Sequence, residues 1–145
     1  MSLGFTVITG ILTVVLSGFA AIFSIITFIK NERDVTYSDI DSAYMEVLKL
    51  GIEYPKFRDP AYTRNYKVAF KDPQERLQYE TYAYIVWNLC ETIYDRNDKV
   101  LFETWEPVII AENKLHRAWL EEPENHHKFK RRFLEFVRSK YPYEK

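Results

Sequence analysis

A long uncharged run opens the chain and most constrains what it can fold into. Leu3 to Ile29 is a run of 27 apolar or small residues, and the first charged side chain is Lys30. A helix that crosses a bilayer needs about 20 such residues. The run also continues well past the small pair Gly18 and Ala20, beyond the about 7–15 apolar residues of a signal peptide. We therefore expect an uncleaved transmembrane helix over 1–29, a juxtamembrane linker over 30–36 and a soluble domain over 37–145.

The flanking charges predict an orientation. No Lys or Arg precedes the apolar run, whereas Lys30 and Arg33 follow it directly. Positively charged flanks stay on the cytoplasmic side of a membrane. The sequence thus predicts a single-pass protein, in the manner of a bacterial inner-membrane protein, with the lipid bilayer as a partner. Its N-terminus would lie outside and its C-terminal domain in the cytoplasm.

Small and hydroxyl residues recur in the apolar run at alternating steps of four and three. This spacing is the seam of a left-handed helix pair or bundle, and small residues allow helices to approach closely in lipid. An oligomerisation seam is the first interpretation, and it predicts a homo-oligomer. A hydroxyl-lined pore of four or more copies, or chance, are the alternatives. The seam residues are Thr6, Gly10, Thr13, Ser17, Ala20, Ser24 and Thr27.

Helical periodicity fills the rest of the chain. Apolar spacing predicts helices over about 37–52, 73–96, 100–120 and 124–140, and no alternating strand pattern exceeds four residues. Asp72 followed by a proline predicts the start of the second helix, and Gly51 and Pro55 mark the end of the first. The fold class is therefore all-α, with a cytosolic bundle of about four helices. The inward face of the long second helix is predicted to include Leu77, Tyr84, Val86, Leu89, Cys90 and Ile93.

Catalytic motifs are missing from the sequence. Only four glycines occur, three of them in the apolar run, which disfavours phosphate-binding loops. The single cysteine, Cys90, fits a small core residue. Glu112 and His116 lie four residues apart, as do Glu91 and Asp95, yet no Glu-x-x-His motif of a di-metal bundle accompanies them. We therefore predict no catalytic, cofactor-binding or metal-binding residue and no enzyme, with a metal-dependent enzyme as the last alternative.

The C-terminal segment is basic. From Glu124 to Lys145 seven basic residues face three acidic ones, although the whole chain has a net charge of −1. The predicted helix could keep these charges in solvent, face anionic lipid headgroups or bind a phosphate-bearing ligand. The near-neutral total disfavours nucleic acid. The candidate anion-binding or headgroup-binding residues are His126, His127, Lys128, Lys130, Arg131 and Arg132.

Three stretches carry a resemblance, namely 87–95 (WNLCETIYD), 105–107 (WEP) and 112–119 (ENKLHRAW). In these, the chain resembles small uncharacterised bacterial proteins with one N-terminal transmembrane helix and a cytosolic all-helical domain. The resemblance implies that architecture and no activity. Together these features predict a self-associating, membrane-anchored sensor or effector that couples a cytosolic ligand or partner to the bilayer. A passive scaffold that holds a protein partner is the alternative.

Overall fold

The computed structural model describes Ser24, Thr27 and residues 37–143, and these are helical or in turns, without a strand. The first continuous part is a helix over residues 37–53, here called the leading helix. The elements that follow are η1 (Pro55–Arg58), α2 (Pro60–Thr63), α3 (Tyr66–Ala69), α4 (Pro73–Asp95), α5 (Lys99–Leu120), α6 (Pro123–His126) and α7 (Arg131–Lys140). The predicted all-α class is confirmed. Short helical turns join the long helices, so the domain is more finely divided than the predicted bundle of about four.

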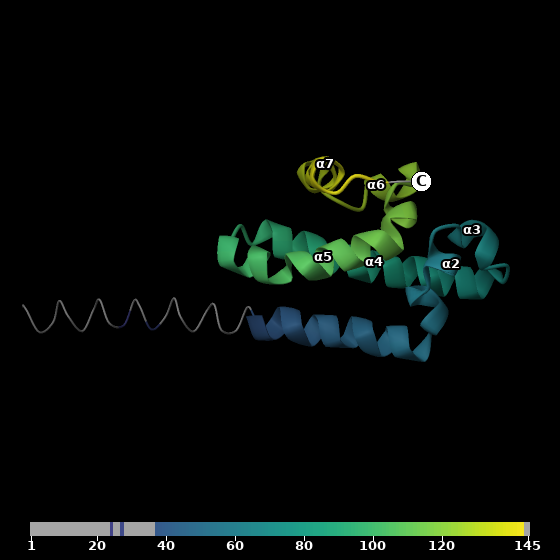
Figure 1. The fold of residues 1–145 in the computed structure, drawn as a ribbon, viewed down its shortest axis with the longest axis horizontal. Coiled ribbons are helices and arrows are strands. Elements are labelled where there is room, and N and C mark those ends of the chain that lie inside the picture. Colours follow the sequence, from purple (N-terminus) through teal and green to yellow (C-terminus); the bar gives the residue numbers. More distant parts are fainter. Residues whose placement is uncertain (1–23, 25–26, 28–36, 144–145) are drawn as a thin grey trace, which may run out of the picture. The chain divides into compact units, whose positions relative to one another are not determined.

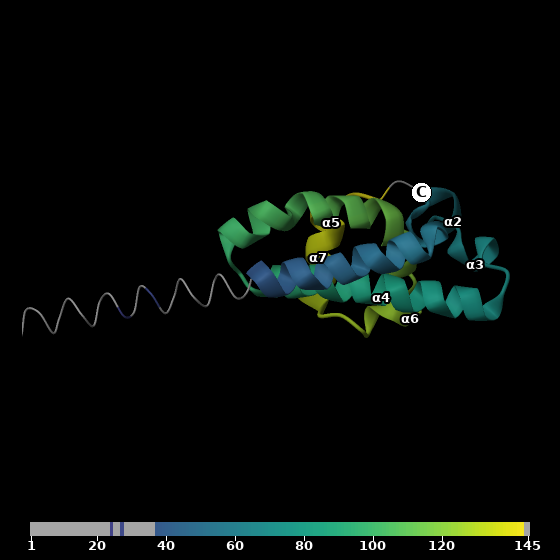
Figure 2. The same ribbon diagram turned by 90° about the horizontal axis from the view of Figure 1, so that it is seen from below.

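From Ile40 onward the described residues form one compact unit built in layers (Figure 1). The long helices α4 and α5 pack against each other in the middle layer. The leading helix lies along one side of this pair, where the Tyr82 hydroxyl of α4 donates to the carbonyl of Val47. Helix α7 lies on the opposite side of the pair (Figure 1), and in Figure 2 the leading helix lies in front of α4 and α5 with α7 behind them. Both faces of the α4–α5 layer are therefore covered, while the outer flank of α4 is left open.

Local sequence signals explain where the two long helices begin. The Asp72 carboxylate accepts hydrogen bonds from the backbone N–H groups of Gln74 and Glu75, and Pro73 occupies the first turn of α4. Asp98 caps α5 in the same way through Val100 and Leu101. Between them, Asn97 takes a positive φ of 51°, a conformation that asparagine tolerates better than most residues. The predicted start of α4 at Pro73 is confirmed.

The predicted final helix over 124–140 is interrupted. The chain leaves the helical path after His126 and resumes it at Arg131. Two contacts hold the break in place: the Phe129 ring is buried against Trp119, and the backbone N–H of Lys130 donates to the Glu91 carboxylate at 2.7 Å. A continuous helix would retain that N–H for its own ladder, so tertiary contacts override the helical pattern here.

Aromatic side chains make up much of the core. Trp87, Tyr79, Phe70 and Phe133 are all fully buried. Their rings form offset and edge-to-face pairs, such as the stacked Phe70–Tyr79 pair with centroids 4.8 Å apart. Such pairs stabilise beyond the area they bury. A core of this kind fixes the faces that α4 and α5 turn inward.

The membrane prediction has to be corrected. No helix in the described part of the chain combines the length and the apolar character that a bilayer crossing requires. The long described helices each carry charged residues, as α4 does with Glu75, Arg76 and Glu80. This finding contradicts the predicted single-pass membrane protein with an outside N-terminus and a cytoplasmic domain, and we withdraw it. The predicted span 1–29 and the linker 30–36 lie outside the described residues, apart from Ser24 and Thr27, which are helical.

Candidate functional site

The open flank of α4 carries no charge. Every residue of α4 that is exposed to solvent is uncharged. Leu77 is 63% exposed and Ile85 is 40% exposed, and polar but neutral side chains surround them. Leu77 and Tyr84 were predicted to face inward, and this part of the prediction is wrong because both are exposed. We call this surface the α4 face; it consists of Gln74, Leu77, Gln78, Thr81, Tyr84, Ile85 and Asn88.

This composition differs from that of other exposed helix surfaces in the same domain. Lys, Arg, Asp and Glu make up 28% of the chain. Helix α7 follows the usual pattern of a solvated helix, with an apolar inner face and charges outside. Five of its six exposed residues are charged, and only Ser139 is not. Depletion of charge together with exposed aromatic and aliphatic groups is the composition found at the centres of protein interfaces.

Two hollows flank the ridge of the α4 face. On one side a groove of about 400 Å³ separates α4 from the leading helix, and Leu50, Tyr54 and Ile85 line it. On the other side a hollow of about 370 Å³ lies between Tyr84, Glu80 and Lys128. Leu77 and Thr81 border both hollows. A helix laid against the ridge would therefore find a recess on either side for its side chains.

The opposite side of α4 meets a buried charged cluster. The Glu112 side chain is only 1% exposed, and Arg58 binds it with both terminal nitrogens, Nη2 to Oε1 at 2.8 Å and Nη1 to Oε2 at 3.2 Å. The Tyr44 hydroxyl donates to Oε1 at 3.1 Å. Arg58 also donates to the Tyr82 hydroxyl at 3.0 Å. We call Tyr44, Arg58, Tyr82, Glu112 and His116 the Glu112 cluster.

His116 completes this cluster from within α5. Its Nδ1 lies 3.2 Å from the Tyr79 hydroxyl, and its Nε2 lies 3.4 Å from Oε2 of Glu112. With Tyr79 donating to Nδ1, the proton of the neutral imidazole sits on Nε2 and faces the carboxylate. Burial lowers the pKa of His116, although Glu112 opposes this shift. The ring is therefore neutral at neutral pH.

In the remaining ionisable groups of the cluster, too, burial and the contacts with charged neighbours together set the pKa. Burial alone would raise the pKa of Glu112, but its contacts with His116 and Arg58 hold that pKa below the usual range. Burial raises the pKa of Tyr44 to about 12. The Glu112 cluster thus contains one anion, one cation and neutral hydrogen-bonding partners. Its contacts join η1 and the leading helix to α5, so the cluster stabilises the packing of these elements.

Gly51 is what lets Arg58 reach Glu112. A Cβ atom at Gly51 would lie 2.3 Å from Cδ and 3.0 Å from Cγ of Arg58. The arginine therefore crosses the leading helix where a side chain is missing. Gly51 and Pro55 were predicted to mark the end of that helix at about residue 52, and the helix ends at residue 53. The space beside the glycine, rather than a turn, accounts for its presence.

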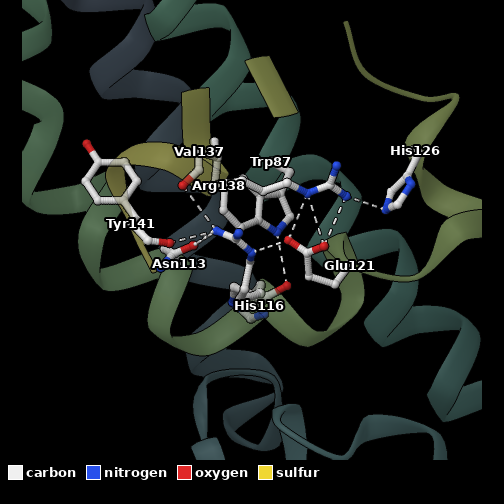
Figure 3. Close-up of polar contacts among 9 residues, drawn as sticks. Trp87, Asn113, His116, Glu121, His126, Val137, Arg138 and Tyr141 are labelled. Carbon is white, nitrogen blue, oxygen red and sulfur yellow. Dashed lines mark hydrogen bonds and ion pairs between the residues drawn. The ribbon is translucent and has the colours of Figure 1, made fainter. Parts of the chain in front are cut away.

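A second polar cluster holds α7 against the C-terminal end of α5 (Figure 3). Arg117 is nearly buried, and its Nη1 donates to Asn113 at 2.9 Å and to the backbone carbonyl of Tyr141 at 3.2 Å. Its Nε pairs with Glu121 at 2.6 Å. Glu121 also forms an ion pair with Arg138 of α7, with Nη2 of the arginine 3.0 Å from Oε2 of the glutamate. Basic groups that satisfy the last carbonyls of a helix stabilise its C-terminus.

The residues predicted to bind an anion make contacts within the domain. Arg132 and Lys130 both pair with Asp95, and Arg131 pairs with Glu135 at 3.1 Å. Lys128 donates to Asn125 and lies over the Trp119 ring. The Nε2 of His126 lies 2.8 Å from Nη2 of Arg138, while His127 is exposed. Anion binding by these residues stays a prediction.

Three further sequence-based hypotheses concern the oligomerisation seam, a metal site and the single cysteine. Ser24 and Thr27 are helical and exposed, and the other five residues of the predicted seam lie outside the described part of the chain. In the region the structure describes, no three His, Cys, Asp or Glu residues gather in a way that could hold a metal ion. Cys90 is buried, and burial raises the pKa of its thiol, which fits the predicted core role.

Comparison with known proteins gives no relative. No family model, no curated protein and no solved structure matches this chain. The resemblance to small bacterial proteins with one transmembrane helix is thereby contradicted, because it rested on three short stretches that no family model matches and on an architecture that the described helices do not show. Function has to be argued from the residues themselves.

Proposed function

We propose that this domain is a non-catalytic helical module that recognises a protein partner through the α4 face. The observation that carries the proposal is that every solvent-exposed residue of α4 between Gln74 and Asn88 is uncharged, whereas five of the six exposed residues of α7 are charged. Solvated helix surfaces acquire charged side chains because these groups are well hydrated there. A helix surface that lacks charged side chains and exposes Leu77 and Ile85 is suited to burial against a partner.

The partner that fits is a helix with an apolar and amide-bearing side of its own. The ridge of α4 offers aliphatic groups for burial, and the hollows beside it receive larger side chains. Polar groups on the α4 face are amides and hydroxyls, which both donate and accept hydrogen bonds. No residue of the α4 face itself is charged, so burying the ridge does not bury an ion; the charges that a partner would meet are those of Glu80 and Lys128, at the border of one hollow.

The placement of the ionisable groups supports binding rather than catalysis. The Glu112 cluster contains titratable residues with shifted pKa values, and its members contact one another. Glu112 and His116 are both buried, so a substrate has no route to them. The contacts that shift these pKa values stabilise the folded domain.

The test is photocrosslinking in intact cells that express the full chain. A photoreactive amino acid replaces Thr81 on the α4 face, and the matched control replaces Val100, which is 59% exposed on α5. We expect a discrete adduct from position 81 and none from position 100. Adding Leu77→Arg and Ile85→Arg, which place unpaired cations in the contact, should abolish the adduct. Equal labelling at both positions, or none at position 81, would refute the proposal.

A further inference from the structure

We infer that the partner of the α4 face is a second copy of this chain, paired antiparallel about a two-fold axis that passes beside Thr81. This inference rests on the proposed function and specifies its partner. In a two-fold pair the same patch faces itself, so a surface must be complementary to its own image. The α4 face meets that requirement in charge, in hydrogen bonding and in the spacing of its residues.

Charge is the first criterion. A face that carried lysines or glutamates would repel its own copy wherever like charges met. The α4 face carries neither, although 28% of the chain is charged. Its polar groups are the amides of Gln74, Gln78 and Asn88 and the hydroxyls of Thr81 and Tyr84. Each of these groups both donates and accepts, so each can pair with an identical group, which a carboxylate or an ammonium cannot do.

Spacing is the second criterion, and it is symmetric about Thr81. Leu77 and Ile85 stand four residues before and after it, and Gln74 and Asn88 stand seven residues before and after it. At about 1.5 Å per residue, these pairs lie about 6 Å and about 10 Å from the axis. An antiparallel copy therefore places Leu77 beside Ile85 of the other chain and Gln74 beside Asn88 of the other chain. Leu77 thus meets an apolar group and Gln74 meets an amide, while Gln78, three residues before Thr81, meets the hydroxyl of Tyr84, three residues after it.

Steric fit is the third criterion. Thr81, at the centre, is the smallest side chain of the α4 face, and its hydroxyl already donates to the Leu77 carbonyl at 2.9 Å. A small residue at the crossing point lets two helices approach to the usual separation of about 8–10 Å. The larger Leu77 and Tyr84 stand beside the hollow that Lys128 borders. The partner's side chains would enter this hollow and the groove next to the leading helix.

The register predicts which cysteine substitutions crosslink. Residues at an axis come close to their own copies, within the Cα separation of about 4.4–6.8 Å that a disulfide needs. The full chain with Thr81→Cys should therefore form a disulfide-linked species of twice the 17.4 kDa chain mass under mild oxidation. Leu77→Cys and Ile85→Cys should not crosslink alone but should crosslink when mixed. Wild type, whose Cys90 is buried, and Val100→Cys are the controls.

The outcomes separate this inference from the proposed function. Crosslinking at position 81 and in the 77/85 mixture, with a yield that does not change with salt, supports the two-fold pair, because an uncharged contact is not screened. No disulfide at position 81, together with a photoadduct of a different mass at that position, would overturn self-pairing and leave a different protein as the partner. A photocrosslink from position 81 to residues 1–36 of the same chain would likewise overturn it. No adduct of any kind would remove both ideas.

Discussion

The two sides of α4 reverse the usual placement of charge. The side that faces α5 and the leading helix borders a buried arginine–glutamate pair and a histidine, whereas the exposed residues on the outer side are uncharged, with the half-buried Glu80 at their border. The inner charges are satisfied by groups of the same chain, so their role is complete within one domain. The outer face exposes apolar groups that the described residues leave uncovered. One side of the helix therefore serves folding, and the other is the side at which we propose that a partner binds.

The largest effect should come from breaking the inner side. Replacing Glu112 by alanine would leave Arg58 partly buried beside Tyr82 without its counter-ion. Removing one member of a buried pair costs about 3–5 kcal/mol, and the partial exposure of Arg58 places this case near the lower end. Urea unfolding of the full chain would measure the loss. The matched control is Glu103→Ala, which removes an exposed carboxylate that faces Lys99 and should cost less than about 1 kcal/mol. Equal losses for the two variants would contradict the stabilising role of the Glu112 cluster.

The second prediction tests the space beside Gly51. Alanine there would ordinarily favour a helix by about 1 kcal/mol, but its Cβ would collide with Arg58. We expect Gly51→Ala to destabilise the chain by about 1–2 kcal/mol, as overpacking does. In an Arg58→Ala background the same change should become neutral or stabilising. A double-mutant cycle of unfolding free energies gives the coupling, and additive effects would show that Arg58 is not what excludes a side chain there.

The third prediction concerns pH. The pKa of His116 is lower in the folded chain than its ordinary value of 6.5, because the ring is buried. The unfolded chain therefore binds a proton at this residue more readily, and stability that is complete above pH 6.5 is lost as pH falls below it. The slope from one such group is at most about 1.4 kcal/mol per pH unit. Unfolding midpoints between pH 5 and 7 would show this loss.

The controls for the pH effect are substitutions of two different histidines. His116→Gln should flatten the pH dependence between pH 5 and 6.5, because no group that titrates there would remain in the Glu112 cluster. His127→Gln, at an exposed position, should leave the slope as it is in wild type. An unchanged slope in His116→Gln would assign the effect to another group. Glu112, whose pKa is lowered, contributes at more acidic pH, because its stabilising effect is lost as pH falls below about 4.

Sequence periodicity predicted the positions of the long helices because caps and apolar spacing act locally. Asp72 and Pro73 mark the start of α4 in the sequence as they do in the structure. The break between α6 and α7 could not be predicted, since it depends on the contact of Lys130 with Glu91, 39 residues earlier in the chain. The membrane prediction rested on the length of an uncharged apolar run and on its flanking charges, and no described helix supports it.

The candidate site was hidden by the same rule that located the helices. Apolar residues at helical spacing predict a core face, and this rule assigns Leu77 to the inward side of α4. A signal was present, because the positions three, four and seven residues from Thr81, which share its face of the helix, carry no charge. The Glu112 cluster was harder to find, because Tyr44, Arg58 and Glu112 come from three elements that only the tertiary fold brings together.

The smallest effect on stability should come from the outer side. Leu77→Gln and Ile85→Gln remove apolar groups that already face solvent, so each should change the unfolding free energy by no more than about 0.5 kcal/mol. The same substitutions should reduce the yield of the Thr81→Cys disulfide, because they remove the apolar contact on both sides of the axis. Val68→Gln, at a position 64% exposed on α3, is the matched control and should change neither quantity. A large loss of stability at positions 77 and 85 would mean that the α4 face belongs to the core of the domain, and the contrast between the two sides of α4 would then fail.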